Sequence, residues 1–325
     1  MNKKEIVELL QSKGKEQKAL FKQAREVRKN IFGNIAFLRA IIEPSNNCRN
    51  RCLYCAMREG SEIVERYRMN PNEIERTADE MAEHGVNTFS IETGEDPKII
   101  DTLVKTIPRL KKKDYSLLGI IGNHEKNDFK RLKDAGLNSY LLKFETSDPN
   151  LFETLRPGTT LKRRLEDLEY LRGLDCTVGT GNIVGLPGQT IENIADDILL
   201  ARQINPEMVS AAPFIPSPGT PLENEPYGNI NLTLNTLAIY RILLPNTQIP
   251  ALCALNHYPN VGQIGGLNAG ANDVLINTAT PESLSSNFAI YSKKKLYVSL
   301  EEGLKVLKKA GLKFDPLERG PLYRK

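Results

Sequence analysis

The 325-residue chain contains no tryptophan, few aromatic residues (6%), five cysteines and three histidines. No apolar run approaches the roughly 20 residues that a membrane-spanning helix requires. The first residues, Met1-Asn-Lys-Lys-Glu5, are polar and charged, so no apolar signal segment is expected there. A net charge of +4 is small against 44 basic and 40 acidic residues and gives no argument for nucleic-acid binding. We therefore expect a cytoplasmic protein with no membrane or nucleic-acid partner, long enough to form one barrel-sized domain.

Three of the cysteines lie close together. Cys48, Cys52 and Cys55 follow the spacing Cys-x3-Cys-x2-Cys, with Tyr54 just before the last one. Thiolates are soft ligands that hold iron–sulfur clusters, and such clusters usually take four cysteines. A compact run of three with no fourth nearby predicts a cluster with one iron open to another ligand.

The competing interpretations of these cysteines are a structural zinc site, a disulfide, or simple packing. Zinc sites usually add a second Cys or His pair at defined spacing, but His84, His124 and His257 are isolated. A disulfide framework is typical of short secreted chains, which this chain does not resemble. Each alternative fits the spacing poorly.

Short apolar segments alternate with amphipathic segments along most of the chain. Eight strands alternating with helices and joined by short links predict a parallel sheet, and at this number closure into a (β/α)8 TIM-type barrel is favoured. The expected helices cover residues 71–84, 97–112, 125–135, 161–173, 190–203, 232–244 and 262–269. The expected strands cover residues 37–42, 88–91, 116–121, 139–142, 177–184, 208–214, 251–255 and 273–276.

The two ends of the chain are expected to lie outside the barrel. Residues 1–35 have a charged helical pattern and predict an N-terminal helical extension. The barrel is expected over residues 36–285, and residues 286–325, with a helical pattern at 299–311, are expected to form a C-terminal cap. The three lysines at 293–295 predict a solvated turn within this cap.

The cysteine motif resembles that of the radical S-adenosylmethionine (SAM) superfamily. The resemblance implies that the open iron binds the amino and carboxylate groups of SAM and that SAM is cleaved to methionine and a 5′-deoxyadenosyl radical. Barrel enzymes carry their chemistry at the C-terminal ends of the strands, so the residues that leave each strand are candidates for the site. The first strand leads directly into the cysteines.

Three further strand ends carry candidate residues. The second strand ends in Glu92-Thr-Gly-Glu-Asp-Pro97, where Gly94 lets the backbone approach a ligand. Glu145 follows the fourth strand and is placed to accept hydrogen bonds from a ribose, and Lys143 shares its face by the strand period of two. The fifth strand ends in a glycine-rich segment, residues 181–190, suited to a close approach of the backbone to adenine.

Further blocks resemble the biotin-synthase-related branch of this superfamily, and most of all the HydE family of maturases, which help to build the organometallic cofactor of [FeFe]-hydrogenase. This resemblance covers about residues 30–285. It implies SAM contacts by Tyr54, Glu145, Arg164, Ile183 and Gly185, a place for Gly94 and Glu95 near the methionine end of SAM, and a substrate-facing, tentatively catalytic Lys143. The matching blocks are Arg66-Tyr-Arg-Met69, Gly94-Glu-Asp-Pro97, Leu155-Arg-Pro157, Val184-Gly-Leu-Pro-Gly-Gln-Thr190, Pro213-Phe-Ile-Pro216, Arg241-Ile-Leu-Leu-Pro245 and Gly270-Ala-Asn272.

The chain departs from that family in two places. Members usually carry Arg-His before the Glu-Thr of the fourth strand, where this chain has Lys143-Phe144. A lysine is a point charge and does not replace an arginine fork, so the identity of the anionic substrate group stays open. Many members also have a second cysteine cluster near the C-terminus, but no cysteine follows Cys253 here.

Three alternatives remain. Methylornithine synthase is also similar, but the positions that align with its substrate-binding arginine and aspartate are Ser210 and Ala254, which cannot bind charged groups. Sulfur insertion of the biotin- or lipoyl-synthase kind needs an auxiliary cluster, for which only Cys176 and Cys253 remain. A non-enzymatic alternative is a barrel that holds a cluster as a scaffold or electron carrier.

The resemblance implies a [4Fe-4S] cluster and SAM as cofactors, and hence anaerobic chemistry. It also implies a small-molecule or small organometallic substrate, an electron donor such as ferredoxin or flavodoxin, and other maturation proteins as partners.

Overall fold

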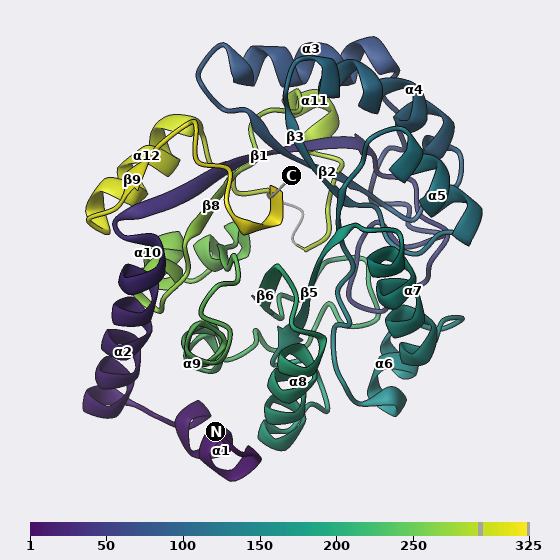
Figure 1. The fold of residues 1–325 in the computed structure, drawn as a ribbon. Coiled ribbons are helices and arrows are strands. Elements are labelled where there is room, and N and C mark those ends of the chain that lie inside the picture. Colours follow the sequence, from purple (N-terminus) through teal and green to yellow (C-terminus); the bar gives the residue numbers. More distant parts are fainter. Residues whose placement is uncertain (292–294, 324–325) are drawn as a thin grey trace.

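The computed structural model describes residues 1–291 and 295–323 and shows a ring of parallel strands surrounded by helices (Figure 1). Around the ring the strands are ordered β6-β5-β4-β3-β2-β1-β8-β7, and all neighbouring pairs are parallel. The predicted TIM-type (β/α)8 barrel is confirmed. The strands are β1 (Ile35–Ser45), β2 (Thr88–Thr93), β3 (Ser116–Ile120), β4 (Ser139–Leu141), β5 (Thr177–Val184), β6 (Met208–Pro213), β7 (Pro250–Ala251) and β8 (Asp273–Ile276), with β9 (Lys313–Phe314) paired to β1 off this path.

The ring closes just before β7. Gln248 forms a parallel bridge with Met208, the first residue of β6. Its carbonyl oxygen accepts a hydrogen bond from Val209 N at 3.0 Å, and its own N–H donates to Glu207 O at 2.9 Å. These bonds satisfy the β6 edge, which would otherwise expose unpaired backbone groups.

Amphipathic helices cover the outside of the ring because each presents an apolar stripe to the strands. Several begin at the capping residues that the sequence places there; for example, Thr190 caps α8 and Asn70 caps α3. The helices are α1 (Lys3–Leu10), α2 (Gly14–Phe32), α3 (Pro71–Ala82), α4 (Ile99–Lys112), α5 (Lys126–Asp134), α6 (Pro149–Leu155), α7 (Leu161–Gly173), α8 (Ile191–Ile204), α9 (Ile230–Leu243), α10 (Gly262–Asn268), α11 (Glu282–Ser285) and α12 (Leu300–Lys309), with 3-10 turns η1 (Cys253–His257) and η2 (Pro321–Tyr323).

The expected seventh strand at 251–255 is wrong. Only Pro250 and Ala251 pair as β7, and the chain then turns into η1. The amide nitrogen of the Gln263 side chain, on α10, donates to Ala251 O and Leu275 O, each at 2.9 Å. A side chain thus satisfies carbonyl groups that a longer strand would have satisfied, and no local pattern in the sequence indicates this exchange.

The N-terminal segment forms two helices on the outside of the barrel. α1 packs against α8, and α2 packs against α9 (Figure 1). Arg28 of α2 anchors this layer, because its guanidinium donates to Leu267 O at 2.6 Å and to Ala271 O at 2.8 Å. The described helices include none that is both long and apolar enough to cross a membrane.

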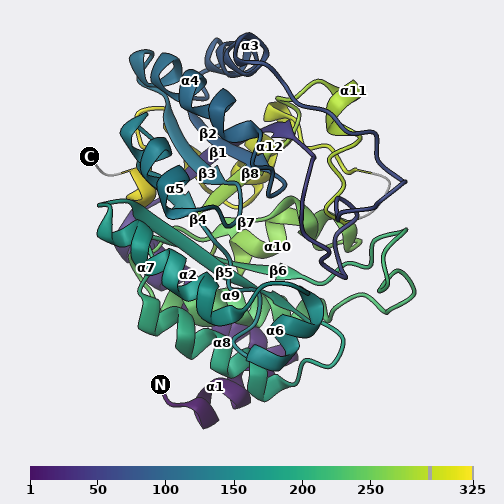
Figure 2. The ribbon, with the colours of Figure 1, turned by 90° about the vertical axis from the view of Figure 1, so that its right-hand side faces the viewer.

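The C-terminal segment returns to the N-terminal ends of the strands. The carbonyl oxygen of Leu322 accepts hydrogen bonds from the hydroxyls of Ser139 and Thr177, at 2.8 and 2.7 Å. In the side view the last described residues, in yellow, lie at one end of the barrel, whereas the irregular loops project from the other end (Figure 2).

A buried ion pair joins the neighbouring strands β1 and β8. Arg39 of β1 and Asp273 of β8 are joined at 2.9 Å and are almost completely excluded from solvent. The side-chain nitrogen of Gln248, Nε2, also donates to Asp273 Oδ2 at 2.9 Å. Burial raises the pKa of Asp273, although the charge of Arg39 opposes this effect. Removing one partner would leave an uncompensated charge in the core.

We expect Arg39→Met to lower the free energy of unfolding by about 3–5 kcal/mol, because Asp273 then stays buried without a cation. The double variant Arg39→Met/Asp273→Asn should recover part of this loss. Urea unfolding followed by circular dichroism measures both. Arg76→Met, which removes an exposed pair with Glu80, is the control and should cost under about 1 kcal/mol. Equal losses for Arg39→Met and Arg76→Met would contradict the assignment.

Candidate active site

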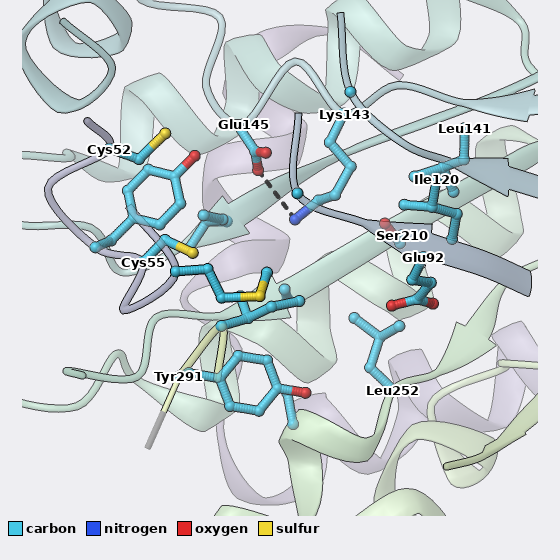
Figure 3. Close-up of a pocket in the computed structure, with 18 of the residues that line it drawn as sticks. Cys52, Cys55, Glu92, Ile120, Leu141, Lys143, Glu145, Ser210, Leu252 and Tyr291 are labelled. Atoms are coloured by element: carbon cyan, nitrogen blue, oxygen red, sulfur yellow. Dashed lines mark ion pairs between the residues drawn. The ribbon is translucent and has the colours of Figure 1, made fainter. Parts of the chain in front are cut away.

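A cavity of about 280 Å³ opens inside the ring, at the C-terminal ends of the strands (Figure 3). Parallel strands all end on the same side of a barrel, so their exit loops meet there. The structure brings ten of the eleven predicted site residues to the lining of this cavity: Cys48, Cys52, Tyr54, Cys55, Gly94, Glu95, Lys143, Glu145, Arg164 and Ile183.

The cysteine loop follows β1 and has no regular secondary structure over residues 46–52. Arg66 supports it from outside, because its guanidinium donates to Met57 O at 2.9 Å and to Arg58 O at 2.7 Å. Leu53 N donates to Leu155 O at 2.9 Å, which ties the loop to the end of α6. Backbone groups without a ladder partner are thus satisfied by one arginine and one neighbouring helix.

Gly94 lies directly against the cysteine loop. A Cβ atom at this position would clash with the carbonyl oxygen of Asn47 and would lie 2.8 Å from Cys48 Cβ. The glycine predicted for approach to a ligand is therefore also required by the packing of the loop that carries the cysteines.

Two arginines share one carboxylate beside the cysteines. Glu95 Oε1 lies 3.0 Å from an Arg156 nitrogen and 3.4 Å from an Arg164 nitrogen, and all three side chains are buried. Burial acts to raise the pKa of Glu95, but the charges of Arg164 and Arg156 outweigh it and hold this pKa below its ordinary value. Arg156 also lies 3.9 Å from Glu145, which pairs with Lys143, so three cations share two carboxylates and leave a surplus positive charge at this place.

This surplus is suited to an anionic ligand. The Nε atoms of both Arg156 and Arg164 are buried and have no hydrogen-bond partner within the described structure. Buried donors of this kind are costly unless a ligand satisfies them. A guanidinium binds a carboxylate in bidentate fashion, so a carboxylate is the group that best fits these donors.

Glu145 has a backbone conformation that is unusual for its residue type. Its φ angle is +63°, in the left-handed region that glycine favours. Glu145 N donates to Gly181 O at 3.0 Å, and Ile183 N donates to Glu145 O at 2.8 Å, so the neighbouring strand holds it in place. Non-glycine residues held in this region cluster at functional sites.

Lys143 points into the cavity and forms an ion pair with Glu145, with 3.0 Å between Nζ and Oε2 (Figure 3). The expected strand at 139–142 ends one residue earlier, at Leu141, so Lys143 and Glu145 both lie beyond it. They reach the same cavity through an irregular turn, not through the alternation of a regular strand as predicted.

Known proteins match this chain over most of its length. The sequence profile of the radical SAM superfamily matches residues 42–201. The chain is 39% identical over 277 residues to the [FeFe] hydrogenase maturase subunit HydE of Thermotoga maritima, covering 85% of this chain and 79% of that protein. The chain belongs to the radical SAM superfamily.

Two other relatives place it in the expected branch. It is 30% identical over 256 residues to a biotin synthase of Clostridium botulinum strain Hall, covering 77% of this chain and 79% of that protein. The crystal structure of methylornithine synthase (PylB) superposes with a TM-score of 0.86 at 26% identity and covers 97% of this chain and 94% of that one.

Membership of the radical SAM superfamily confirms the predicted cofactors and enzyme class. The protein is a radical SAM enzyme that uses a [4Fe-4S] cluster and SAM, which sets aside the scaffold or electron-carrier alternative. When bound, the cluster and SAM supply a 5′-deoxyadenosyl radical. The described residues show no group of three or more His, Cys, Asp or Glu that would hold a single metal ion. In a cluster each cysteine binds its own iron, so the three sulfurs surround a volume instead of a point.

The cysteine thiols are set in a poorly hydrated environment. Burial raises the pKa of Cys48, Cys52 and Cys55, and the charge of Arg156 opposes this for Cys52. Iron binds thiolates, so cluster loading must release protons from these buried groups. The donor set fits the cluster that the radical SAM superfamily uses.

Gly185 is the one predicted site residue that does not line the cavity. Its φ angle is +85°, and a Cβ atom there would approach Gly228 Cα to 2.6 Å. Glycine at this position therefore serves a tight turn beneath the cavity.

The buried carboxylate of Asp197 supports the segments that follow β4 and β5. Asp197 of α8 accepts hydrogen bonds from Ser147 N at 2.6 Å, Asn182 Nδ2 at 3.0 Å and Gln189 Nε2 at 3.1 Å. Burial raises the pKa of Asp197 to about 6. Ser147 follows Glu145 by two residues, so Asp197 fixes the turn that carries Glu145.

The same network reaches the fifth strand through Gln189. Its side-chain oxygen accepts from Gly185 N at 2.7 Å and Leu186 N at 3.2 Å, and its nitrogen donates to Ile183 O at 3.0 Å. One buried carboxylate thus links the segment at Glu145 to the end of β5 at Ile183.

Sequence reasoning missed several residues of the site. The sequence predicts no role for Arg156, which lies in the matching block Leu155-Arg-Pro157. In the structure it contacts Glu95 and donates to the Tyr54 hydroxyl at 2.9 Å. Arg39 and Glu92 also line the cavity. A charged residue within an apolar strand is the signal that would have found them, because such a residue is rarely buried without a partner.

The two remaining cysteines occupy different environments, and one lysine lies elsewhere than expected. Cys176 is buried in the apolar core, where its thiol faces Leu137 O, and it does not line the cavity. Cys253 is in η1 and does line the cavity. Lys295, expected in a solvated turn, is largely buried and forms an ion pair with Glu43, whereas residues 293 and 294 lie outside the described residues.

We expect Cys52→Ala to abolish loading of the cluster, because a three-cysteine site cannot lose a ligand and still leave only one iron open. Iron content and the absorbance of the anaerobically reconstituted protein measure this. Cys176→Ala is the matched control and should load iron as the wild type does. Loss of iron in the control, or stoichiometric zinc without iron in the wild type, would show that the ligands are misassigned.

Proposed function

We propose that this radical SAM enzyme acts on a small substrate held beside SAM in the central cavity, as a maturase of the HydE kind. The similarity to HydE, 39% identity over 85% of the chain, carries this proposal. The geometry supports it, because the three cysteines, the paired arginines, Glu145 and Lys143 all line one cavity.

The cavity offers a distinct place for each part of SAM. Arg164 and Arg156 have the surplus positive charge and free donors that suit its carboxylate, beside Glu95 and Gly94. The Glu145 carboxylate is an acceptor for the two hydroxyls of its ribose. Tyr54 and Ile183, in one apolar cluster with Cys52, provide a surface for its remaining parts.

Lys143 is the proposed contact for the substrate. It presents an ammonium group to the cavity, and within the described residues Glu145 is its one carboxylate partner. The ribose hydroxyls of SAM would bind the Glu145 carboxylate, and an anionic substrate would bind the Lys143 ammonium group. Lys143 would therefore lie where the two ligands meet. A single point charge of this kind binds a carboxylate or another small anion without demanding a planar geometry.

The two enzymatic alternatives receive less support. Ser210 and Ala254, at the positions aligned with the charged residues of methylornithine synthase, line the cavity without charge. Sulfur insertion needs a second cluster, and the two remaining cysteines lie apart, one in the core and one at the cavity. An electron donor such as ferredoxin or flavodoxin, and other maturation proteins, are the partners that this function requires.

Genetic complementation tests the proposed role. We expect this chain to restore hydrogenase activity in a bacterial strain that lacks its own HydE, with 5′-deoxyadenosine formed by the purified reconstituted protein in the presence of SAM and a reductant. Formation of 5′-deoxyadenosine without complementation would retain the radical SAM chemistry but refute the HydE-type role.

The same strain tests Lys143. We expect Lys143→Met to lose complementation because the substrate loses its charged contact, although the side chain keeps most of its length. Lys162→Met, at an exposed position on α7, is the matched control and should complement as the wild type does. Full complementation by Lys143→Met would remove the lysine from the substrate site.

We expect Asp197→Asn to weaken SAM binding about tenfold, because the amide cannot accept all the bonds that the carboxylate accepts and the turn at Glu145 loosens. Equilibrium binding of SAM to reconstituted protein measures this, with iron content as the check on folding. Asp196→Asn, the exposed neighbour that pairs with Lys3, is the control. Combining Asp197→Asn with Glu145→Gln should give less than the sum of the single effects; full additivity would mean that Asp197 does not act through Glu145.

A further inference from the structure

One carboxylate in the cavity has no partner. Glu92, near the end of β2, lines the cavity and pairs in register with Ile120 of β3. Its side chain makes no hydrogen bond and no ion pair within residues 1–291 and 295–323. Figure 3 shows it on the side of the cavity away from Cys52 and Cys55.

The other charged groups around the cavity are already paired. Among the described residues each cation there lies within 4 Å of a carboxylate: Arg156 and Arg164 share Glu95, and Arg156 also lies 3.9 Å from Glu145, the partner of Lys143. Glu92 is therefore the carboxylate left over, and the cavity carries surplus positive charge near the cysteines and surplus negative charge at Glu92. The pairs are Arg39 with Asp273, Lys143 with Glu145, Lys295 with Glu43, and Arg156 and Arg164 with Glu95.

Apolar side chains adjoin Glu92 in its part of the cavity. Ile41, Ile120 and Leu252 line the same part of the cavity, and a smaller cavity of about 50 Å³ adjoins it at Glu92 and Cys253. An unpaired carboxylate in such a place is poorly hydrated and gains much from a cationic partner. Glu92 thus offers a negative charge to a cationic group, and the described residues place no such group within ion-pair distance of it.

We infer that Glu92 recognises a positively charged hydrogen-bond donor on the substrate, an ammonium group or protonated amine. This inference rests on the proposed function in that it places the substrate in the SAM-bound cavity. Lys143 and Glu92 then distinguish the two ends of a dipolar substrate, because one binds an anion and the other a cation.

The protonation state of Glu92 makes this recognition dependent on pH. Burial raises its pKa to about 7, and the negative charge of Glu43 adds to this effect. A bound ammonium group favours the ionised carboxylate and lowers this pKa, so binding at pH 7 releases protons and strengthens as the pH rises from 6 to 8. The titratable or charged groups facing Glu92 from the neighbouring elements are Arg39 and Glu43 of β1, Lys143 after β4, Cys253 and His257 of η1, and Tyr291 and Lys295 of the C-terminal segment.

The test compares two probes of equal size on the reconstituted, SAM-loaded protein: n-butylammonium and n-butanol. Calorimetric titration at pH 7.5 should show at least about tenfold tighter binding of the ammonium, as expected for a charge-assisted hydrogen bond in a desolvated site. Titration in two buffers of different ionisation enthalpy should show proton release. Equal affinity for the two probes, or no binding of n-butylammonium, would overturn the inference without the need for any variant.

Variants then assign the preference to Glu92. Glu92→Gln preserves the shape and removes the charge, and it should abolish the preference for the ammonium. Glu166→Gln, at an exposed position on α7, is the matched control and should keep it. A preference that persists in Glu92→Gln would locate the cation site elsewhere. These outcomes are independent of complementation: failed complementation with an intact ammonium preference refutes the HydE-type role alone.

Discussion

The closure of a ring of parallel strands is the constraint on which the rest of this molecule depends. Because all strands run in the same direction, their exit loops must meet at one end of the barrel. Gln248 completes the ring through backbone hydrogen bonds to Glu207 and Val209, the residues before and after Met208 at the start of β6. The cysteine loop after β1, the turn after β4 and the end of β5 are distant in sequence, and this closure brings them to one cavity.

Burial within the ring makes each charge costly unless it is paired. Almost every ionised side chain around the cavity has a partner of opposite charge, as in the Arg39–Asp273 pair between β1 and β8. Two groups depart from neutrality: the double arginine at Glu95 and the lone carboxylate of Glu92. In a poorly hydrated cavity these departures act at short range on whatever ligand enters, so they define its two polar ends.

The SAM-facing turns owe their shape to support from behind. Glu145 adopts a left-handed backbone conformation that a free chain would rarely populate. Asp197 holds the segment just after Glu145 through Ser147 N, and Gln189 holds the segment that follows β5 through Gly185 N. Such conformations persist only where the surrounding structure enforces them. The network of Asp197 on α8 and Gln189 just before α8 thus supports the site, although neither side chain lines the cavity.

The sequence by itself determined the cysteine motif, the number and order of most strands and helices, and hence the barrel, because these follow from local spacing and hydrophobic periodicity. It also indicated Gly94, Glu95 and Glu145, since a motif or a strand end marked them, whereas Arg164 was indicated only by the resemblance to HydE. Only the tertiary structure revealed the pairing of Arg156 with Glu95, the support of Glu145 by Asp197, the short β7 completed by the Gln263 side chain, and the unpaired state of Glu92. The first three are contacts between residues far apart in the chain, and the fourth is the lack of such a contact. Three-dimensional packing decides whether a buried charge has a partner, and no local pattern encodes this.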